Sequence, residues 1–448
     1  MKRFIDIYLR QWKNQANFKP LLLRGARQVG KTYAVRELGK QFDQFVELNL
    51  ESNPNVRNLF TKELDPKKII EEIGYLTKKK ITPGKTLLFF DEIQAEPQAI
   101  LALRYFYEMM PELHVIAAGS LLDFAIEKVG VPVGRVEFLY MYPMSFLEFL
   151  YAYDNSILIE IITKHNNPEK EISTIAHEQL LKLVATFIAL GGMPEVIKNF
   201  IQDKDLNQCF KTQQTLINSY KYDFNKYGKW SQIKYLDKLF ESIPLLLGKK
   251  FKYSSIEGDF RKRELAPCLD LLVTAGVAHK IYHTDAQGLP LGAQADLEKF
   301  KILFLDIGLS QATLGLDISK WLLNPENQFI NKGEIVEAFI GQELLAYSDT
   351  YQKHQLFYWL RTERTSQSEI DYVINIANKI VPIEVKSGST GSLKSMHIFI
   401  KTHPKSPIGI KFSTKNYSKH NNIYVYPLYA IFTAIESKTA KDFIKTIT

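Results

Sequence analysis

Cysteine is scarce in this sequence: its 448 residues include only two, Cys209 and Cys268. Both lie in apolar stretches with helical periodicity, which excludes a disulfide framework and a metal centre built from thiolates. Such scarcity is typical of proteins that stay in a reducing compartment. We therefore predict a cytoplasmic location.

Long apolar runs are also missing. The longest, such as residues 183–190, fall far short of the roughly 20 residues that a membrane-spanning helix needs. The first residues contain no apolar signal segment either. The sequence thus predicts no membrane contact.

An excess of one charge is present but small, since 57 Lys and Arg face 49 Asp and Glu, for a net charge of +8. That balance permits contact with nucleic acid without requiring it. With 46% hydrophobic and 12% aromatic residues, the chain has the material for folded cores. Its length suggests roughly two to four domains, and we divide it into residues 1–155, 156–295 and 296–448.

The first part alternates short apolar runs with helical segments. The runs are LLLRGA, FVELNL, TLLFFDE and HVIAAGS, and helices are expected over residues 3–17 and 97–110. This alternation is typical of an α/β layer with a parallel sheet. We therefore predict a nucleotide-binding fold for residues 1–155.

The pattern changes after Gly134. Helical segments continue to about residue 247, and residues 251–285 then predict two short helices followed by a strand pair, the outline of a winged helix. A third unit contains KILFLDIGL, a helix over residues 332–348 and two strands with a turn over residues 370–388. The predicted fold class is α/β throughout, with a helical and winged-helix middle.

Residues 25–32 read GARQVGKT, which matches the phosphate-binding pattern G-x-x-x-x-G-K-[ST] between an expected strand and an expected helix. Glycines let backbone N–H groups close around phosphates at a helix N-terminus. Lys31 is expected to neutralise phosphate charge, and the Thr32 hydroxyl to bind Mg²⁺. The predicted nucleotide contacts are Gly25, Arg27, Gln28, Val29, Gly30, Lys31, Thr32 and Tyr33.

Two further strand ends carry candidates for the same chemistry. In LLFFDE, Asp91 is predicted to hold Mg²⁺ and Glu92 to polarise the attacking water, so ATP and Mg²⁺ are the expected cofactors. Ser120, after VIAAG, is a candidate contact to the γ-phosphate or the water, the alternative being a helix cap. Arg135 is a candidate to stabilise the transition state in its own or a neighbouring subunit, the alternative being a surface arginine.

The strand pair over residues 370–388 carries an unusual set of charges. Asp371 and the Glu384-x-Lys386 pair fit the D…E-x-K arrangement of restriction-endonuclease-like folds, and the upstream helix offers Glu337 and Glu343 as a further acid. Carboxylates so placed can hold Mg²⁺, which activates water and steadies a phosphate. We predict Asp371, Glu384 and Glu337 as metal ligands, with Lys386 catalytic. The alternative is a structural salt bridge made by Lys386.

A basic cluster opens the second helix of the predicted winged helix. Arg261, Lys262 and Arg263 stand in RKREL, where they can reach DNA phosphates. The alternative is a hinge or an oligomer contact, which winged helices attached to ATPases often form.

Taken together, GARQVGKT, LLFFDEIQ, AAGS, GRVEFLYMYPMSFLEFL and GGMPEV resemble the AAA-type ATPases of bacteria and archaea that carry a carboxy-terminal domain of unknown function. FLDIGL, GEIVEAFIGQEL, SEIDYV and PIEVKSG resemble that carboxy-terminal domain. The resemblance implies an ATPase module, a helical or winged-helix lid and a nuclease-like terminal domain. Two departures stand out: the usual serine run after the third strand is here Ser120-Leu121-Leu122, and the lid shows no second sensor arginine.

Two functions remain open. One is an ATP-hydrolysing protein that acts on DNA through the winged helix and the nuclease-like domain. The other is an ATP-dependent switch or scaffold for a protein partner, with a catalytically silent terminal domain. A homo-oligomer is compatible with both, whereas a kinase or GTPase lacks an acceptor site or a guanine-recognition motif.

Overall fold

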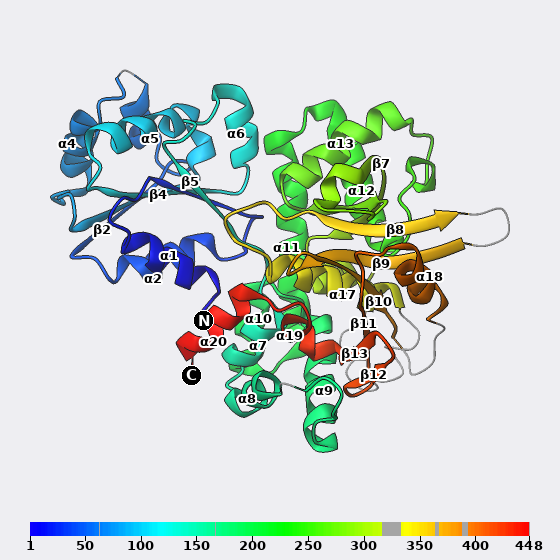
Figure 1. Cartoon of the computed structure of the whole chain (residues 1–448). Helices are drawn as coiled ribbons and strands as arrows, with labels where there is room; N and C mark the ends of the chain where they lie inside the picture. Colours follow the sequence, from blue (N-terminus) through cyan, green and yellow to red (C-terminus); the bar gives the residue numbers. More distant parts are fainter. Residues whose placement is uncertain (62, 166, 316–332, 363–366, 388–392, 448) are drawn as a thin grey trace.

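The computed structural model describes residues 1–61, 63–165, 167–315, 333–362, 367–387 and 393–447. Three bodies follow one another along the chain in Figure 1: a parallel sheet with helices, a helical middle and a second, mixed sheet. No helix in these ranges combines the length and the apolar content that crossing a membrane requires.

The first sheet has five parallel strands in the order β2-β3-β4-β1-β5. Its central strands β3 and β4 are buried at every position, which explains why their sequences are continuous apolar runs. The predicted α/β class and the four predicted strands are confirmed. The strands are β1 (Leu21–Arg24), β2 (Gln44–Asn49), β3 (Thr86–Asp91), β4 (His114–Gly119) and β5 (Glu137–Tyr140).

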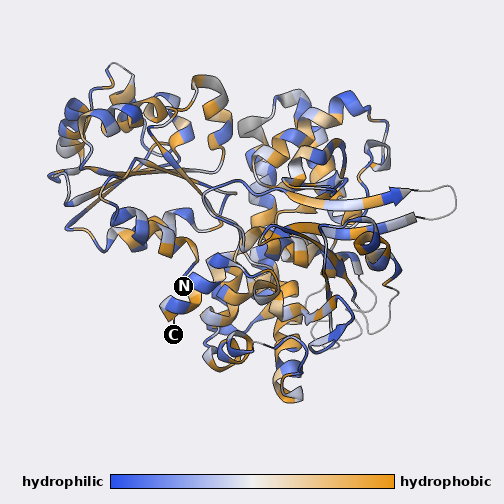
Figure 2. Cartoon of the chain, viewed as in Figure 1, coloured by the Kyte–Doolittle hydropathy of each residue, from blue (hydrophilic) through white to orange (hydrophobic). Residues whose placement is uncertain are grey.

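Helices cover both faces of this sheet (Figure 1), with α1 and α2 on one side and α4, α5 and α6 on the other. Alternate residues of each strand enter the two cores, so Leu21 and Leu23 face α2 while Leu22 faces the other layer. Figure 2 shows the strands mostly in the hydrophobic colour. The helices are α1 (Ile5–Lys13), α2 (Lys31–Gly39), α3 (Pro54–Arg57), α4 (Pro66–Thr77), α5 (Pro97–Met109) and α6 (Leu122–Val129).

The middle of the chain is helical. Its longest helix, α11, packs against α10, α12 and α14 and reaches the first sheet unit. The helices are α7 (Phe146–Ala152), α8 (Ser156–Lys164), α9 (Thr174–Leu190), α10 (Pro194–Asp203), α11 (Leu206–Tyr227), α12 (Ile233–Ser242), α13 (Lys262–Thr274) and α14 (Ile307–Thr313).

The second sheet has eight strands in the order β12-β13-β11-β10-β9-β8-β6-β7. The hairpin β6–β7, which follows α12 and α13 as a wing would, pairs through β6 with β8 and is therefore part of this sheet. The boundary predicted between residues 295 and 296 thus falls at the start of β7. The strands are β6 (Ala278–Thr284), β7 (Ala295–Phe304), β8 (Leu356–Thr362), β9 (Gln367–Ile376), β10 (Lys379–Val385), β11 (Gly409–Ser413), β12 (Ser418–His420) and β13 (Ile423–Pro427).

The terminal unit returns to the first one, so that both chain ends lie close together (Figure 1). The Phe4 and Phe443 rings pack edge to face with centroids 4.9 Å apart, and the Tyr8 and Thr439 hydroxyls lie 3.0 Å apart. Helices of this unit are α17 (Gly333–Ala346), α18 (Lys394–Thr402), α19 (Ile431–Ala434) and α20 (Lys438–Ile447).

A buried carboxylate joins the end of α9 to the segment between β7 and α14. Asp306, from the FLDIGL motif, caps α14 by accepting from Leu309 N at 2.9 Å and also accepts from Gly192 N at 2.6 Å. A Cβ on Gly191 would lie 2.0 Å from its Oδ1, so that position admits only glycine. Burial raises the pKa of Asp306 to about 6. The GGMP and FLDIGL motifs therefore contact each other directly and have a structural role.

Candidate nucleotide site and terminal carboxylate cluster

The phosphate-binding loop, or P-loop, follows β1 and leads into α2. Gly25, Gln28 and Gly30 all have positive φ, and a Cβ on Gly25 would lie 2.2 Å from Met141 O. Glycine is thus required at Gly25 by conformation and by space. Because the loop ends at the N-terminus of α2, its backbone N–H groups and the helix dipole suit it to phosphate.

Lys31 is the first residue of α2 and is buried. Its Nζ donates to the carbonyl oxygens of Gly25 at 2.9 Å and Ala26 at 2.8 Å. Burial lowers the pKa of Lys31 to about 8, while the charges of Glu92 and Asp91 oppose that change. The ammonium is therefore held against the loop at which phosphates are expected.

Thr32 and Asp91 meet as the sequence predicts. The Thr32 hydroxyl donates to Asp91 Oδ2 at 3.1 Å, although the two residues are 59 positions apart. Burial, and then the neighbouring charge of Glu92, raise the pKa of Asp91. An oxygen pair beside the P-loop fits Mg²⁺, which prefers a few carboxylate or hydroxyl ligands together with phosphate oxygens.

Glu92 follows β3 with a left-handed φ of 50°. The Gln94 side-chain amide donates to its carboxylate, and Gln94 Oε1 packs so closely on Gly119 that a Cβ there would lie 2.1 Å away. Sequence reasoning missed Gln94, although its place in DEIQ and the glycine in AAGS were the available signals. Glu92 is thereby tied to the end of β4, which Ser120 follows.

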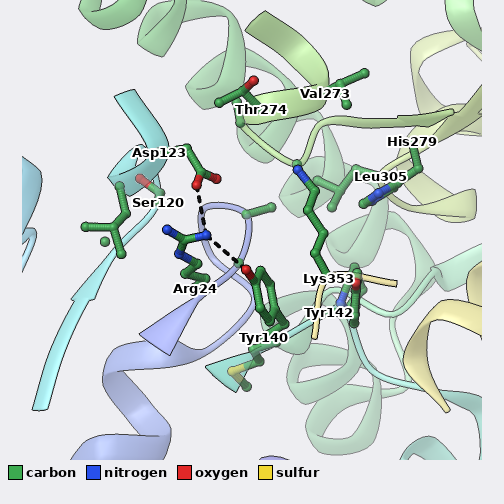
Figure 3. A pocket seen from close by; sticks show the side chains of 18 residues that line it. Arg24, Ser120, Asp123, Tyr140, Tyr142, Val273, Thr274, His279, Leu305 and Lys353 are labelled. Carbon is green, nitrogen blue, oxygen red and sulfur yellow. Dashed lines mark hydrogen bonds and ion pairs between the residues drawn. The ribbon is translucent and has the colours of Figure 1, made fainter. Parts of the chain in front are cut away.

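Ser120 lines a cavity of about 50 Å³ beside the P-loop, shown in Figure 3. Arg24 enters the same cavity, where its Nη1 lies 2.9 Å from Tyr140 Oη and 3.0 Å from Asp123 Oδ1. His279 lines the other side, and burial lowers its pKa to about 4. The cavity therefore separates the end of β1 from the β6 hairpin.

Arg135 lies at the amino ends of the sheet strands, whereas the P-loop lies at their carboxyl ends. Strand β5 runs parallel to β1, and Arg135 precedes β5 whereas the P-loop follows β1. Its Nε lies 3.1 Å from Glu108 Oε1. The structure therefore does not bring Arg135 to the P-loop of its own chain, and a role in a neighbouring subunit stays a prediction.

Helix α11 of the middle part holds the P-loop. Arg27 Nη1 donates to both carboxylate oxygens of Asp223, at 2.7 and 2.6 Å, and the Tyr220 hydroxyl donates to Arg27 O. The predicted contact residue Arg27 thus has its side chain turned to α11. Neither partner could be found from the sequence, because 196 residues separate Arg27 from Asp223.

The N-terminal segment holds the P-loop from the other side. Arg3 is buried and donates to Val29 O at 2.9 Å, Tyr142 O at 2.8 Å and Glu148 Oε1 at 2.8 Å. Tyr33 remains half exposed and its hydroxyl accepts from the N-terminal amine at 3.1 Å. Sequence reasoning missed Arg3 because nothing in its local pattern distinguishes it from an exposed arginine.

The terminal site brings together Asp371, Glu384, Lys386 and Glu337. Asp371 Oδ2 accepts from the Val385 backbone at 2.7 Å, and Lys386 forms an ion pair with Glu384. Burial, followed by the charge of Asp371, raises the pKa of Glu384 to about 7.

A lysine that sequence reasoning missed enters this cluster from β7. Lys301 Nζ lies 2.8 Å from Glu337 Oε1 and 4.0 Å from Asp371 Oδ1, and it contacts Glu369 as well. In the described ranges no group of three or more His, Cys, Asp or Glu side chains is arranged to hold a metal ion. The structure thus brings the acids Asp371, Glu384 and Glu337 together with two lysines, and their role as metal ligands stays a prediction.

Glu343, the other acid offered on α17, lies elsewhere. Its carboxylate accepts from Phe146 N at 3.0 and 3.1 Å, at the start of α7. Burial raises its pKa to about 8. Glu343 therefore caps a helix.

The predicted DNA-contacting residues begin α13. Arg261, Lys262 and Arg263 are all exposed, and Lys262 Nζ lies 2.8 Å from Glu298 Oε2 on β7. The Arg261 backbone N–H also donates to Glu264 Oε2 at 2.9 Å. Two arginines therefore face solvent beside a lysine that already has an acidic partner.

Comparison with known families divides the chain in three. A family model described as an AAA domain matches residues 17–150. Two models described as domains of unknown function, DUF8612 and DUF4143, match residues 181–320 and 332–431. No curated protein matches the chain.

Solved structures that match this chain include a Walker-type ATPase of Pyrococcus abyssi, with 14% identity, a TM-score of 0.43 and coverage of 69% of this chain and 94% of that one. The Drosophila ORC bound to DNA has 13% identity, a TM-score of 0.26 and the same two coverages. The S. cerevisiae Hsp104-ADP complex has 11% identity, a TM-score of 0.30 and coverage of 77% and 44%. At these scores the likenesses carry no inference about function.

Proposed function

We propose that this chain, whose residues 17–150 form an AAA-type P-loop domain, hydrolyses ATP and passes the state of its nucleotide site to the middle and terminal parts. The observation that carries the proposal is the contact between Thr32 and Asp91, because it unites the motifs that follow β1 and end β3, the strands on either side of β4, beside a buried P-loop lysine. Each motif alone has a structural alternative, a glycine turn for GARQVGKT and a helix-capping acidic pair for Asp91 and Glu92, whereas their contact favours nucleotide chemistry.

Each residue of the nucleotide site would have its own role in ATP binding or hydrolysis. The backbone of residues 28–31 would surround the β-phosphate, and Lys31 would offset phosphate charge. Thr32 and Asp91 would hold Mg²⁺, which neutralises charge on the phosphates. Glu92 would orient the attacking water, with Gln94 fixing its carboxylate, and Ser120 would contact the γ-phosphate or the water.

Transmission to the rest of the chain would run through α11. Arg27 lies within the loop that must close on phosphate. Its guanidinium Nη1 donates to both carboxylate oxygens of Asp223. Tyr220 holds the carbonyl of the same residue. Any movement of the loop on binding or release of phosphate would therefore move α11 or break these bonds.

The experiment is to measure phosphate release from ATP with Mg²⁺ for the wild type and for Asp223→Asn. We expect the wild type to turn over ATP and the variant to lose about 2- to 30-fold in kcat/KM, the usual range for a change at a coupling contact. Glu241→Gln is the matched control, since Glu241 pairs with Lys221 on the same helix but at an exposed site. A wild type without Mg²⁺-dependent turnover would refute the proposal, and equal effects of the two variants would refute the route through α11.

A second candidate function is DNA binding by the start of α13. The observation that favours it is the exposure of Arg261 and Arg263 side by side at a helix N-terminus, where backbone N–H groups also suit phosphate. Lys262 would have to leave Glu298 to take part.

Replacing Arg261, Lys262 and Arg263 with alanine is expected to weaken duplex DNA binding and to reduce the slope of log affinity against log salt by about 2 to 3, because each phosphate contact contributes roughly 0.9. Fluorescence anisotropy over a salt series measures both. A triple alanine change at the exposed residues Lys78, Lys79 and Lys80 removes the same charge and is expected to leave the slope nearly unchanged. Equal loss in both variants would indicate a diffuse charge effect instead of a site.

A further inference from the structure

We infer that Lys301 is a built-in cation of the terminal carboxylate cluster, and that it takes the place a divalent metal ion would need. The terminal unit then holds no Mg²⁺ at these acids in its folded state. This inference goes beyond the proposed ATPase function and does not depend on it.

The position of Lys301 is unusual for a lysine. It lies on β7 between Phe300 and Ile302 and is only 1% exposed, so its side chain cannot reach water as most lysines do. A buried ammonium is tolerated only where opposite charges and hydrogen bonds replace its hydration. The terminal cluster supplies those partners.

The partners of Lys301 come from two other elements. Glu337 belongs to α17, with Nζ to Oε1 at 2.8 Å, while Glu369 and Asp371 belong to β9. The Tyr358 ring of β8 lies under the ammonium, with its centroid 5.3 Å from Nζ. One lysine of β7 thus links α17 and β9 through their acids, as a bound cation would.

The same acids are those that a metal ion would use. Glu337 and Asp371 both face Lys301, and one carboxylate oxygen of Asp371 also accepts a hydrogen bond from Val385 N. Glu384 is engaged by Lys386, although its Oε2 is buried without a hydrogen-bond partner. Lys301 and Lys386 are therefore paired with the acids of the D…E-x-K arrangement. The described residues contain no group of three or more His, Cys, Asp or Glu side chains arranged to hold a metal ion.

Competition between Lys301 and a metal ion follows from charge and space. A divalent ion bound between Glu337 and Asp371 would lie close to an ammonium that has no route to solvent, and their repulsion in a dry interior is strong. Binding would require Lys301 to give up Glu337 and Asp371 and would leave Glu369 as its one acidic partner among these three.

The test measures binding of Mn²⁺ to full-length protein without nucleotide, by electron paramagnetic resonance and by the metal-induced change in unfolding temperature. All proteins carry Asp91→Asn, so that the nucleotide site contributes nothing. We expect the protein that retains Lys301 to bind no Mn²⁺ at the cluster. The control is Lys299→Met, at an exposed lysine on the same strand, and it is expected to bind none there either. Lys301→Met is expected to bind one Mn²⁺ per chain and to gain unfolding temperature with it, and Asp371→Asn is expected to abolish both gains.

Either of two results would overturn the inference. One is Mn²⁺ binding by the Lys301 wild type that Asp371→Asn removes, which would show that the acids hold metal beside the lysine. The other is a folded Lys301→Met protein that gains no Mn²⁺. If Lys301→Met does not fold, the double variant Lys301→Met with Glu337→Gln replaces it, because this variant removes one charge of each sign. The comparison of wild type with Asp371→Asn requires no Lys301 variant.

Discussion

Replacing Lys31 with alanine is expected to lower kcat/KM for ATP by about 100- to 1,000-fold, the usual cost of removing one preorganised donor from developing charge. Its ammonium is buried against the carbonyl oxygens of Gly25 and Ala26, so it lies beside the loop at which phosphates are expected. Because burial lowers the pKa of Lys31 to about 8, affinity of the wild type for ATP should fall as pH rises through that value. Phosphate release and equilibrium ATP binding at several pH values measure both effects.

Two variants separate charge from packing. Lys31→Met keeps most of the aliphatic stem and is expected to lose activity as alanine does, without the dependence on pH near 8. Lys40→Ala, at the exposed end of the same helix, should leave hydrolysis unchanged. If Lys31→Ala hydrolysed ATP at the wild-type rate, the P-loop would have no part in the turnover.

The P-loop could be predicted because its constraints are local. Positive φ at Gly25 and Gly30, and the turn into α2, involve consecutive residues and leave a pattern in the sequence. Burial of both faces of β3 likewise leaves a continuous apolar run. Such features need no knowledge of which distant residues meet.

The contacts that surround the loop could not be predicted in this way. Asp223 on α11 and Arg3 near the N-terminus are ordinary charged residues until the fold brings them to Arg27 and Val29. Lys301 left a weak signal, a lysine inside the apolar run FKILF, but a strand edge would give the same letters. Pairing among distant charges is decided by tertiary packing.

The two acids on α17 illustrate the same limit. Glu337 and Glu343 are six residues apart, which turns them by about 240° around the helix at 100° per residue. They must therefore face different neighbours, and only the packing of α17 decides which acid meets Lys301 and which meets Phe146. From the sequence both remained candidates for one site.

Replacing Glu92 with glutamine is expected to lower kcat by about 100- to 10,000-fold, the range for loss of a positioned general base, while ATP binding is retained. The change keeps the shape of a side chain at a strained φ and leaves Lys31, Thr32 and Asp91 in place. It removes only the carboxylate charge that Gln94 now holds. Single-turnover hydrolysis beside equilibrium binding of ATP distinguishes the two steps.

The matched control is Glu96→Gln, which alters the partly exposed N-cap of α5 four residues further along and should leave kcat nearly unchanged. A Glu92→Gln protein that turns over at the wild-type rate would remove this glutamate from the mechanism, whereas loss of binding would indicate damage to the P-loop. Because Gln94 ties Glu92 to Gly119, an alanine at Gly119 should displace the same carboxylate without touching its charge. A fall in kcat in both variants, with ATP affinity preserved, would mean that the position of the carboxylate matters as much as its ionisation.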